Sequence, residues 1–469
     1  MKKRKMIGII LSLIIISTSI YGGVKPLPKG ISLDGQVYRT NQVDFLYDLT
    51  YEKDGKIEKE QMIFDRVFKI IDNAERFIII DMFLFNDTYD KKCSYPDLSA
   101  KLTNAIIRKK QKNPDIKVTF ISDEMNTFYG SYPSTHLEAM EKNDVNVVLT
   151  DLNQLRDSNP SYSGFWRVFI GWFKTSGKGW LPNPFSKDAQ KVTFRSYLKL
   201  LNFKANHRKL IVTDKQALVS SANPHDASAY HSNIAFVVGG AIVKDIVAGE
   251  KAIGNFSGKT VDGEYEQNEK QEGTIRISFI TEEKIRKNLL EAIEKTKAGD
   301  VIQIGMFYFS ERNLVESLIK AANRGVKIQM ILDANKDAFG MEKNGIPNRP
   351  VAHELFEKSN GKIKIRWYNT HGEQFHTKLV KIQYKDESTI VGGSANLTRR
   401  NIGDYNLEAD LKIMAKNDSK IVKDVEQYFD RIWENKNGNY TLDFKEYHET
   451  SVVKNRIYRL QEWSGLSTF

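Results

Sequence analysis

The same order of apolar and amphipathic segments occurs twice along the chain. An apolar run of strand length over residues 77–87 is followed by an amphipathic stretch and by a second apolar run that ends at Asp123. The second half repeats this order, with an apolar run over residues 301–311 and another that ends at Asp333. Short apolar runs that alternate with segments of 3.6-residue period are typical of βαβ units. The pattern predicts an α/β protein with two repeats, each a mostly parallel sheet with flanking helices.

The boundary between the repeats is predicted from composition. Residues 254–273 form a polar, acidic stretch with several glycines, which is typical of a linker. This linker divides the chain into a first repeat over residues 40–253 and a second repeat over residues 274–440. A C-terminal tail over residues 441–469 follows.

The first repeat contains an insert rich in aromatic residues. His207 lies 84 residues after Asp123, whereas His376 lies only 43 residues after Asp333, so about 41 residues are added in the first repeat. The insert, at about residues 160–190, contains Phe165, Trp166, Phe169, Trp172, Phe173, Trp180 and Phe185. Aromatic rings interspersed with Lys and Arg favour a membrane interface. The alternative is that these rings fill a core beneath a long loop.

The N-terminal segment, residues 1–25, has the composition of an export signal. Four basic residues at positions 2–5 precede an uninterrupted apolar run over residues 6–23. The run is intermediate in length between a secretory signal and a membrane span, and no clear small-x-small cleavage site follows it. This favours an uncleaved anchor over a cleaved signal peptide. The basic end should stay in the cytoplasm, so the rest of the chain should face the extracytoplasmic side, or be secreted if the segment is cleaved.

Charge and cysteine content restrict the partners. The 70 Lys and Arg residues exceed the 59 Asp and Glu residues, and the net charge of +11 favours anionic partners such as phospholipid headgroups or nucleic acid. Cys93 is the only cysteine, which excludes an intramolecular disulfide bond and a cysteine-based metal cluster.

Two segments, one in each repeat, carry similar polar residues in the same order. Each has His and Lys two positions apart on a predicted strand, so that both side chains project from one face. Each then returns through a hairpin to a Ser-Ala-Asn turn. The first segment provides His207, Lys209, Asp214, Ser221 and Asn223, and the second provides His376, Lys378, Gly393, Ser394 and Asn396.

This set suits the cleavage of a phosphodiester with no metal ion or other cofactor. A neutral imidazole can attack phosphorus, and an imidazolium can protonate the departing alkoxide. The two lysines supply cationic donors for the phosphate oxygens and the two asparagines supply neutral donors, while the two serines bind phosphate oxygens or neighbouring side chains. A single His-x-Lys pair is usually a surface feature, but its occurrence in matching places of a duplicated chain indicates a catalytic site.

The two segments resemble the signature of the phospholipase D superfamily, H-x-K-x4-D-x6-G-S-x-N, which occurs twice per active unit. In the first copy Ser220 stands where glycine is usual. In the second copy the hairpin is four residues longer, and Gln383 takes the aspartate position. The resemblance covers roughly residues 40–435. It implies a pseudo-twofold active site between two packed sheets, ping-pong kinetics through a phosphohistidine intermediate, and no cofactor.

The resemblance also implies an acidic residue beyond each signature that orients the histidine of that signature. Glu408, 32 residues after His376, takes this place in the second copy. After correction for the longer hairpin, the matching position in the first copy is Ala235. Glu408 is therefore predicted to raise the pKa of His376 and make it the better proton carrier. The resemblance separately implies that the histidine of the first copy, His207, is the nucleophile.

Other polar residues near the two segments have two interpretations each. His225, Asp226 and His231 are candidates for a substitute partner of the first histidine, or they are solvated loop residues. Asp123 and Asp333 end their strands where α/β sites gather, or they act as helix caps.

The sequence predicts a phosphodiesterase that acts on phospholipids at a membrane surface, by phospholipase D-type hydrolysis or by phosphatidyl transfer, with water or an alcohol as the acceptor. The stretch YLKLLNFKANHRKLIV, residues 197–212, resembles bacterial cardiolipin-synthase-related proteins. The alternatives are a cardiolipin synthase-type transferase, a secreted or anchored nuclease, and a lipid-binding module of weak activity. The basic charge supports the nuclease, and the aromatic insert opposes it.

Overall fold

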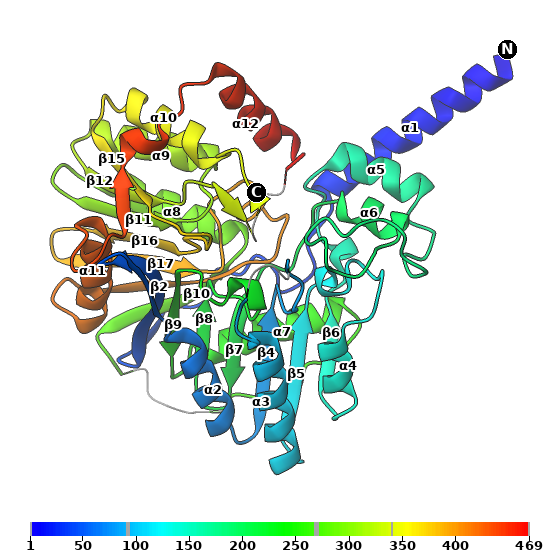
Figure 1. The fold of residues 1–469 in the computed structure, drawn as a ribbon, viewed down its shortest axis with the longest axis horizontal. Coiled ribbons are helices and arrows are strands. Elements are labelled where there is room, and N and C mark those ends of the chain that lie inside the picture. Colours follow the sequence, from blue (N-terminus) through cyan, green and yellow to red (C-terminus); the bar gives the residue numbers. More distant parts are fainter. Residues whose placement is uncertain (1, 91–93, 267–271, 339–340, 468–469) are drawn as a thin grey trace.

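Two large sheets account for most of the strands of the chain (Figure 1). The structure is a computed structural model that describes residues 2–90, 94–266, 272–338 and 341–467. In the order of the first sheet, the strands are β3 (Lys56–Glu60), β2 (Val43–Lys53), β9 (Asn233–Val238), β8 (Ala217–Ser220), β7 (Lys209–Thr213), β4 (Phe77–Met82), β5 (Lys117–Ser122) and β6 (Asn146–Leu149).

The second sheet has the same core order as the first. Its strands are β1 (Tyr38–Thr40), β10 (Ile275–Thr281), β18 (Ala409–Lys416), β17 (Glu387–Gly393), β16 (Lys378–Gln383), β11 (Val301–Met306), β12 (Lys327–Leu332), β15 (Ile363–Tyr368) and β19 (Thr441–Asp443). The series β2-β9-β8-β7-β4-β5-β6 thus corresponds to β10-β18-β17-β16-β11-β12-β15. The prediction of an α/β protein with two repeats is confirmed. A small hairpin, β13 (Asp337–Ala338) with β14 (Met341–Glu342), lies apart from both sheets.

The prediction that the sheets are mostly parallel is wrong. Parallel pairing is limited to β4-β5-β6 in the first sheet and β11-β12-β15 in the second. The other pairings in both sheets are antiparallel. The reason lies in the connections, because strands joined by a short turn, such as β7-β8 and β16-β17, can pair only in the antiparallel direction.

The largest apolar cluster joins the two sheets. It includes Val219 and Phe236 from the first sheet and Ile390 and Leu411 from the second, all with no exposed surface. Close packing of this kind leaves the two sheets little freedom to shift, so it fixes the position of one repeat relative to the other. Residues from opposite repeats can therefore form one rigid site.

Helices cover the sheets. Those of the first half are α2 (Ile63–Asn73), α3 (Leu98–Lys112), α4 (Thr135–Glu141), α5 (Pro160–Phe169), α6 (Phe194–Leu200) and α7 (Val243–Phe256). Those of the second half are α8 (Glu283–Glu294), α9 (Arg312–Asn323), α10 (Asn348–Lys358), α11 (Lys420–Trp433) and α12 (Val452–Ser464). The segment expected to be a linker, residues 254–273, begins within α7, and its residues 267–271 lie outside the described residues. The expected tail, residues 441–469, adds β19 to the second sheet and forms α12.

The N-terminal helix α1 (Lys2–Val24) projects from the body of the protein, and its C-terminal part packs against α5 (Figure 1). The helix over residues 3–24 is long and apolar enough to cross a membrane. A signal sequence near an N-terminus has the same length and composition, so this property fits either an anchor or a signal. The end of α1 nearest the body lies beside α5 of the aromatic insert, where Arg167 Nη1 donates a hydrogen bond of 2.8 Å to the carbonyl oxygen of Thr18. The apolar N-terminal helix and the aromatic insert are therefore packed against each other.

Candidate active site

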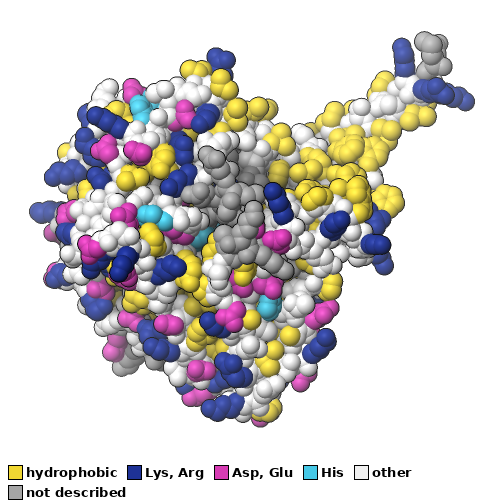
Figure 2. Space-filling model, viewed as in Figure 1, with side chains coloured by type: hydrophobic (Ala, Val, Ile, Leu, Met, Phe, Trp, Pro, Cys, Tyr) yellow, Lys and Arg dark blue, Asp and Glu magenta, His cyan; other side chains and the backbone are white. Residues whose placement is uncertain are grey.

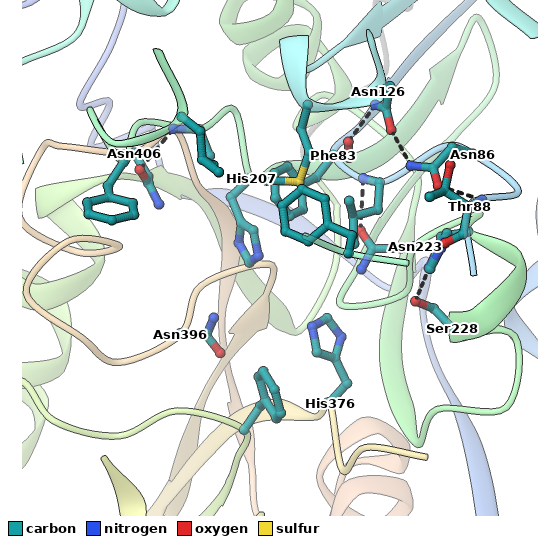
Figure 3. Close-up of a pocket in the computed structure, with 18 of the residues that line it drawn as sticks. Phe83, Asn86, Thr88, Asn126, His207, Asn223, Ser228, His376, Asn396 and Asn406 are labelled. Atoms are coloured by element: carbon teal, nitrogen blue, oxygen red, sulfur yellow. Dashed lines mark hydrogen bonds between the residues drawn. The ribbon is translucent and has the colours of Figure 1, made fainter. Parts of the chain in front are cut away.

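A cavity of about 420 Å³ lies where the two repeats meet (Figure 3). His207 and His376 point toward each other across it, and Asn223 and Asn396 also line its wall. The structure therefore brings both predicted histidines and both predicted asparagines together in one site.

Two isolated β-bridges connect the repeats beside this cavity. Asn206, just before His207, pairs in parallel with Leu407 of the second repeat, and Phe375, just before His376, pairs in parallel with Ser232 of the first. These pairings place the residue that follows Leu407 beside the first histidine. They place the residue that follows Ser232 beside the second.

Glu408 therefore contacts His207 and not His376. Its Oε1 atom lies 2.8 Å from Nδ1 of His207, and its side chain is fully buried. The prediction that Glu408 orients the histidine of its own signature is wrong, because the interrepeat pairing carries Glu408 to the opposite half. With its Nδ1 side facing a carboxylate, His207 keeps Nε2 available on the other side of its ring.

Asn233 is the corresponding partner of His376. Its Oδ1 atom lies 3.1 Å from Nδ1 of His376. The amide orientation is fixed because Nδ2 of Asn233 donates to the carbonyl oxygen of His231 at 3.0 Å. Oδ1 must then accept from the ring, so Nδ1 of His376 carries a proton and Nε2 is the atom left for chemistry.

The match of Glu408 to Ala235 is also wrong, and the signature serines show why. Ser394 Oγ donates to Glu408, and Ser221 Oγ donates to Asn233 at 2.9 Å. Glu408 lies twelve residues after Asn396, whereas Asn233 lies ten residues after Asn223. The second copy is therefore longer at two places, by four residues in the hairpin and by two residues between the asparagine and Glu408. The serines thus hold the two residues that face the histidines.

Burial disfavours charge on both histidines. It lowers the pKa of His207 and that of His376 well below the ordinary value, and the positive charges of Lys209 and Lys378 add to this effect. Burial also raises the pKa of Glu408 well above its ordinary value. Both rings are therefore held in the neutral form that a nucleophile requires until a phosphate arrives.

The two signature lysines are fully buried and have equivalent contacts. Nζ of Lys209 donates to the carbonyl oxygen of His207 at 2.6 Å, and Nζ of Lys378 donates to that of His376 at 2.9 Å. Burial lowers the pKa of Lys209 to about 7 and that of Lys378 well below its ordinary value. Each ammonium has three donors, so two remain for phosphate oxygens.

The asparagines lie on the cavity wall, as expected. Asn223 Oδ1 accepts a hydrogen bond of 3.3 Å from the Leu84 amide, which leaves its amide NH₂ for a ligand. Asn396 also lines the cavity, and its buried Oδ1 has no hydrogen-bond partner among the described residues. Both side chains suit neutral donation to phosphate.

Asp214 lies outside the cavity and has a structural contact. Its Oδ1 atom accepts from the backbone amides of Glu75 and Arg76, at 3.0 and 3.1 Å, at the turn before β4. Gln383, in the equivalent position, accepts from Lys381 instead. The loss of aspartate in the second copy therefore removes no group from the cavity.

Ser220 and Ala235 explain the missing glycine of the first signature. In the second copy, a Cβ on Gly393 would lie 2.7 Å from Oδ1 of Asp410, which accepts from the Ala395 amide. In the first copy the small side chain of Ala235 leaves room, and Ser220 Oγ accepts from the Ala222 amide at 2.9 Å. A serine hydroxyl thus replaces a carboxylate in the same backbone contact.

Asp123 and Asp333 bind the backbone just before the two cavity histidines. Asp123 caps a short 3₁₀ helix and accepts from the Asn206 amide at 2.7 Å. Asp333 accepts from the Phe375 amide at 2.8 Å. Each carboxylate therefore fixes the residue immediately before a cavity histidine.

His225, Asp226 and His231 do not replace Glu408 as the partner of the first histidine. The ring of His225 lies between Ser228 Oγ and the Thr88 carbonyl, at 3.0 and 3.1 Å. Asp226 accepts from Ser99 at the start of α3. His231 accepts from the Gln374 amide and lies beside the second histidine, with ring centroids 5.9 Å apart.

Sequence reasoning missed several residues of the cavity wall. Phe83 and Phe307 lie against the two histidines, with ring centroids 4.7 and 5.0 Å from those of His207 and His376. A Met-Phe pair at the end of each repeat's first strand was the available signal. Arg400, just beyond the second signature, also lines the cavity, and burial lowers its pKa to about 10.

Part of the chain matches a known family model, and its fold is similar to that of a solved structure. Residues 289–433 match the family model described as "Cardiolipin synthase, PLD-like domain". The crystal structure of phosphatidylserine synthase from Haemophilus influenzae Rd KW20 has a similar fold, with a TM-score of 0.56 and 12% identity over 91% of this chain and 94% of that one. Nuc, a phospholipase D family member from Salmonella typhimurium, is 18% identical over 35% of this chain and 97% of its own, with a TM-score of 0.26. No curated protein sequence matched the chain.

Residues 289–433 therefore match a PLD-like domain of the kind described for cardiolipin synthase, and the chain as a whole is a two-repeat α/β protein with a fold similar to that of the phosphatidylserine synthase structure. At 12% identity, the similarity to the solved structure concerns the fold alone.

Proposed function

We propose that the protein transfers the phosphatidyl group of a membrane phospholipid to water or to an alcohol, through a phosphohistidine at His207. The observation that carries this proposal is the pair of facing histidines with different partners. His207 contacts a carboxylate, and His376 contacts an amide. The Glu408 carboxylate stabilises the positive charge that the His207 ring gains when its Nε2 bonds to phosphorus, so His207 suits the role of nucleophile and His376 that of the acid.

In the first step Nε2 of His207 attacks phosphorus, and the bond to the departing alcohol breaks. His376 gives a proton to that alcohol oxygen, which leaves as a neutral hydroxyl. In the second step His376 takes a proton from water or from an acceptor alcohol, whose oxygen attacks phosphorus and releases His207. Lys209, Lys378 and the two cavity asparagines bind the phosphate oxygens as charge builds on them.

The cavity wall supports a lipid substrate. The cavity lining includes many apolar and aromatic side chains, among them Leu84, Met125, Tyr129, Pro184, Phe185, Leu200, Phe203, Phe307 and Tyr308. A nucleic acid could stack bases on the aromatic rings, but its polar, charged backbone would leave the aliphatic side chains without a complementary surface. An acyl chain or a glycerol backbone would cover them.

The insert supports access from a membrane. Trp172 and Trp180 are 82% and 64% exposed, and Phe173 is 61% exposed, so these rings do not fill a core. Figure 2 shows apolar side chains gathered along α1 and α5. Phe185 of the same insert lines the catalytic cavity. We infer that α1 is an anchor and that the insert lies at headgroup depth beside the cavity entrance.

The decisive experiment uses full-length protein in detergent with mixed phospholipids, with and without added glycerol, followed by mass spectrometry of the lipids. Phosphatidic acid without glycerol, and phosphatidylglycerol with it, are the expected products. The family match to a cardiolipin synthase domain favours a second acceptor, the free hydroxyl of phosphatidylglycerol, which would give cardiolipin.

The intermediate is tested separately. His376→Ala should accumulate a phosphatidyl adduct on His207 with substrates whose leaving group needs no proton, and His207→Ala should accumulate none. Turnover of lipid by His207→Ala at the native rate would exclude the mechanism. Cleavage of DNA in preference to every lipid would instead favour the nuclease alternative.

A further inference from the structure

Two histidines and a glutamate gather on the surface away from the catalytic cavity. His353 and Glu357 lie one turn apart on α10, so both side chains project from the same face of the helix. His448 reaches them from the connection between β19 and α12. The three residues are partly or fully exposed, and one ligand atom from each lies within 4.8 Å of the others. None of the three lines the catalytic cavity.

We propose that this cluster binds a divalent transition-metal ion, with Zn²⁺ as the preferred ion, and that the ion fastens the C-terminal segment to α10. Imidazole nitrogens and a carboxylate oxygen form a ligand set that Zn²⁺ accepts, whereas Mg²⁺ and Ca²⁺ prefer oxygen ligands alone. Three protein ligands leave a fourth position for water at this exposed place.

The geometry needs only a small adjustment. Nδ1 of His353 lies 2.7 Å from Nε2 of His448. Ligand atoms on a tetrahedral Zn²⁺ ion lie roughly 3.3 Å apart, because each bond is about 2.0–2.1 Å long. Rotation of the His353 ring, which is only partly buried, provides the difference. Without the ion, one of these nitrogens donates a hydrogen bond to the other. When the metal binds, the proton of the donor moves to the other nitrogen of the same neutral ring, so that both ligand nitrogens present a lone pair.

Aromatic side chains hold the His448 ring in place. Its centroid lies 4.8 Å from that of Phe444, which stacks on Phe356 of α10 at 4.7 Å. A ligand that is already fixed loses less conformational entropy on binding, so this arrangement favours a site over a chance cluster. The nearby cation Lys358 pairs with Glu354 at 2.7 Å and so does not engage Glu357.

The ion would act through α12, which begins a few residues beyond His448. Tyr458 on α12 is fully buried and accepts a hydrogen bond of 2.8 Å from Arg312. Glu462 accepts from the backbone amide of Arg399, just beyond the second signature, at 3.1 Å. Fastening the segment before α12 would keep this helix against the second repeat.

Full-length protein in detergent, stripped with chelator and dialysed, should bind one equivalent of Zn²⁺ in calorimetry, with a rise in the midpoint of thermal unfolding. Co²⁺ in the same site should give the visible absorption of tetrahedral coordination. Metal binding should also slow deuterium exchange in residues 444–464. His448→Ala and His353→Ala should lose the bound equivalent, the Co²⁺ spectrum and the exchange protection.

His371→Ala is the matched control. His371 is a partly buried histidine near two carboxylates, 3.9 Å from Glu52 and 3.8 Å from Glu373, and among the described residues it belongs to no cluster that could hold a metal ion. This variant should keep the bound equivalent. Zinc binding by His448→Ala equal to that of the native chain, or no binding by the native chain at all, would overturn the proposal. The rate on a short-chain phospholipid should not change in His448→Ala, because the cluster lies outside the cavity.

Discussion

Glu408 of the second repeat lies 2.8 Å from the Nδ1 atom of His207 in the first repeat. In return, Asn233 of the first repeat lies 3.1 Å from the Nδ1 atom of His376 in the second. Each repeat therefore supplies the residue that orients the histidine of the other repeat. A single repeat of this chain would hold an unoriented imidazole, so the duplication is a requirement of the site and not only a record of its origin.

The first prediction concerns Glu408→Gln. An amide can present its NH₂ to Nδ1 and favour the wrong tautomer, so kcat should fall by roughly 10²- to 10⁴-fold. Loss of the carboxylate should lower the pKa of His207 further, because the charged imidazolium loses its negative neighbour. The acid limb of the kcat/KM profile should then move to lower pH. An unchanged pH profile in a folded variant, checked by circular dichroism, would contradict the pairing.

The second prediction concerns Asn233→Asp, which gives His376 the acidic partner that it lacks. A carboxylate at this place favours the imidazolium, so the pKa of His376 should rise and the basic limb of the pH profile should move to higher pH. The variant also loses the donor to the His231 carbonyl, so its thermal stability should fall. Asn233→Ala should reproduce the loss of stability but not the upward shift. If both variants moved the basic limb equally, the carboxylate would not be the cause.

The sequence was sufficient for the duplicated fold and for the main groups of the site. The two histidines, lysines and asparagines were predicted because their spacing repeats, and local spacing fixes which side chains share a strand face. The partner of each histidine could not be predicted in this way. It depends on the pairing of Asn206 with Leu407, which joins residues 201 positions apart. Spacing along the chain carries no information about such a contact.

Asn233 was missed for a simpler reason. The alignment of the two signatures allowed for a longer hairpin but not for the two extra residues before Glu408, and so it stopped at Ala235. Side chains two positions apart in a strand lie on the same face of the sheet, so an alignment that is wrong by two residues still matches the hydrophobic pattern. The hydrogen bonds of Ser221 and Ser394 were needed to set the register.

The third prediction is that an anion takes up protons when it enters the cavity. Burial lowers the pKa of Lys209 to about 7 and the pKa of each histidine well below its ordinary value. A bound anion favours the charged forms and raises these pKa values, so near pH 7 binding should consume protons. Calorimetry with vanadate in buffers of different ionisation enthalpy measures this number. Lys209→Met should reduce the uptake, and an uptake of zero at every pH would show that these groups do not face the anion.

The last prediction separates membrane contact from chemistry. Trp172→Ser, Phe173→Ser and Trp180→Ser, combined in the full-length chain, should reduce the rate on phospholipid vesicles at least tenfold, because each ring that enters the interface contributes about 1.5–3 kcal/mol. The rate on a monomeric short-chain phospholipid should be unchanged, since none of these three residues lines the cavity. Val452→Ser with Trp463→Ser, which removes exposed apolar groups from α12, is the matched control and should leave both rates unaltered. Equal losses on vesicles and on monomers would mean that the insert supports the fold of the cavity and not its access to a bilayer.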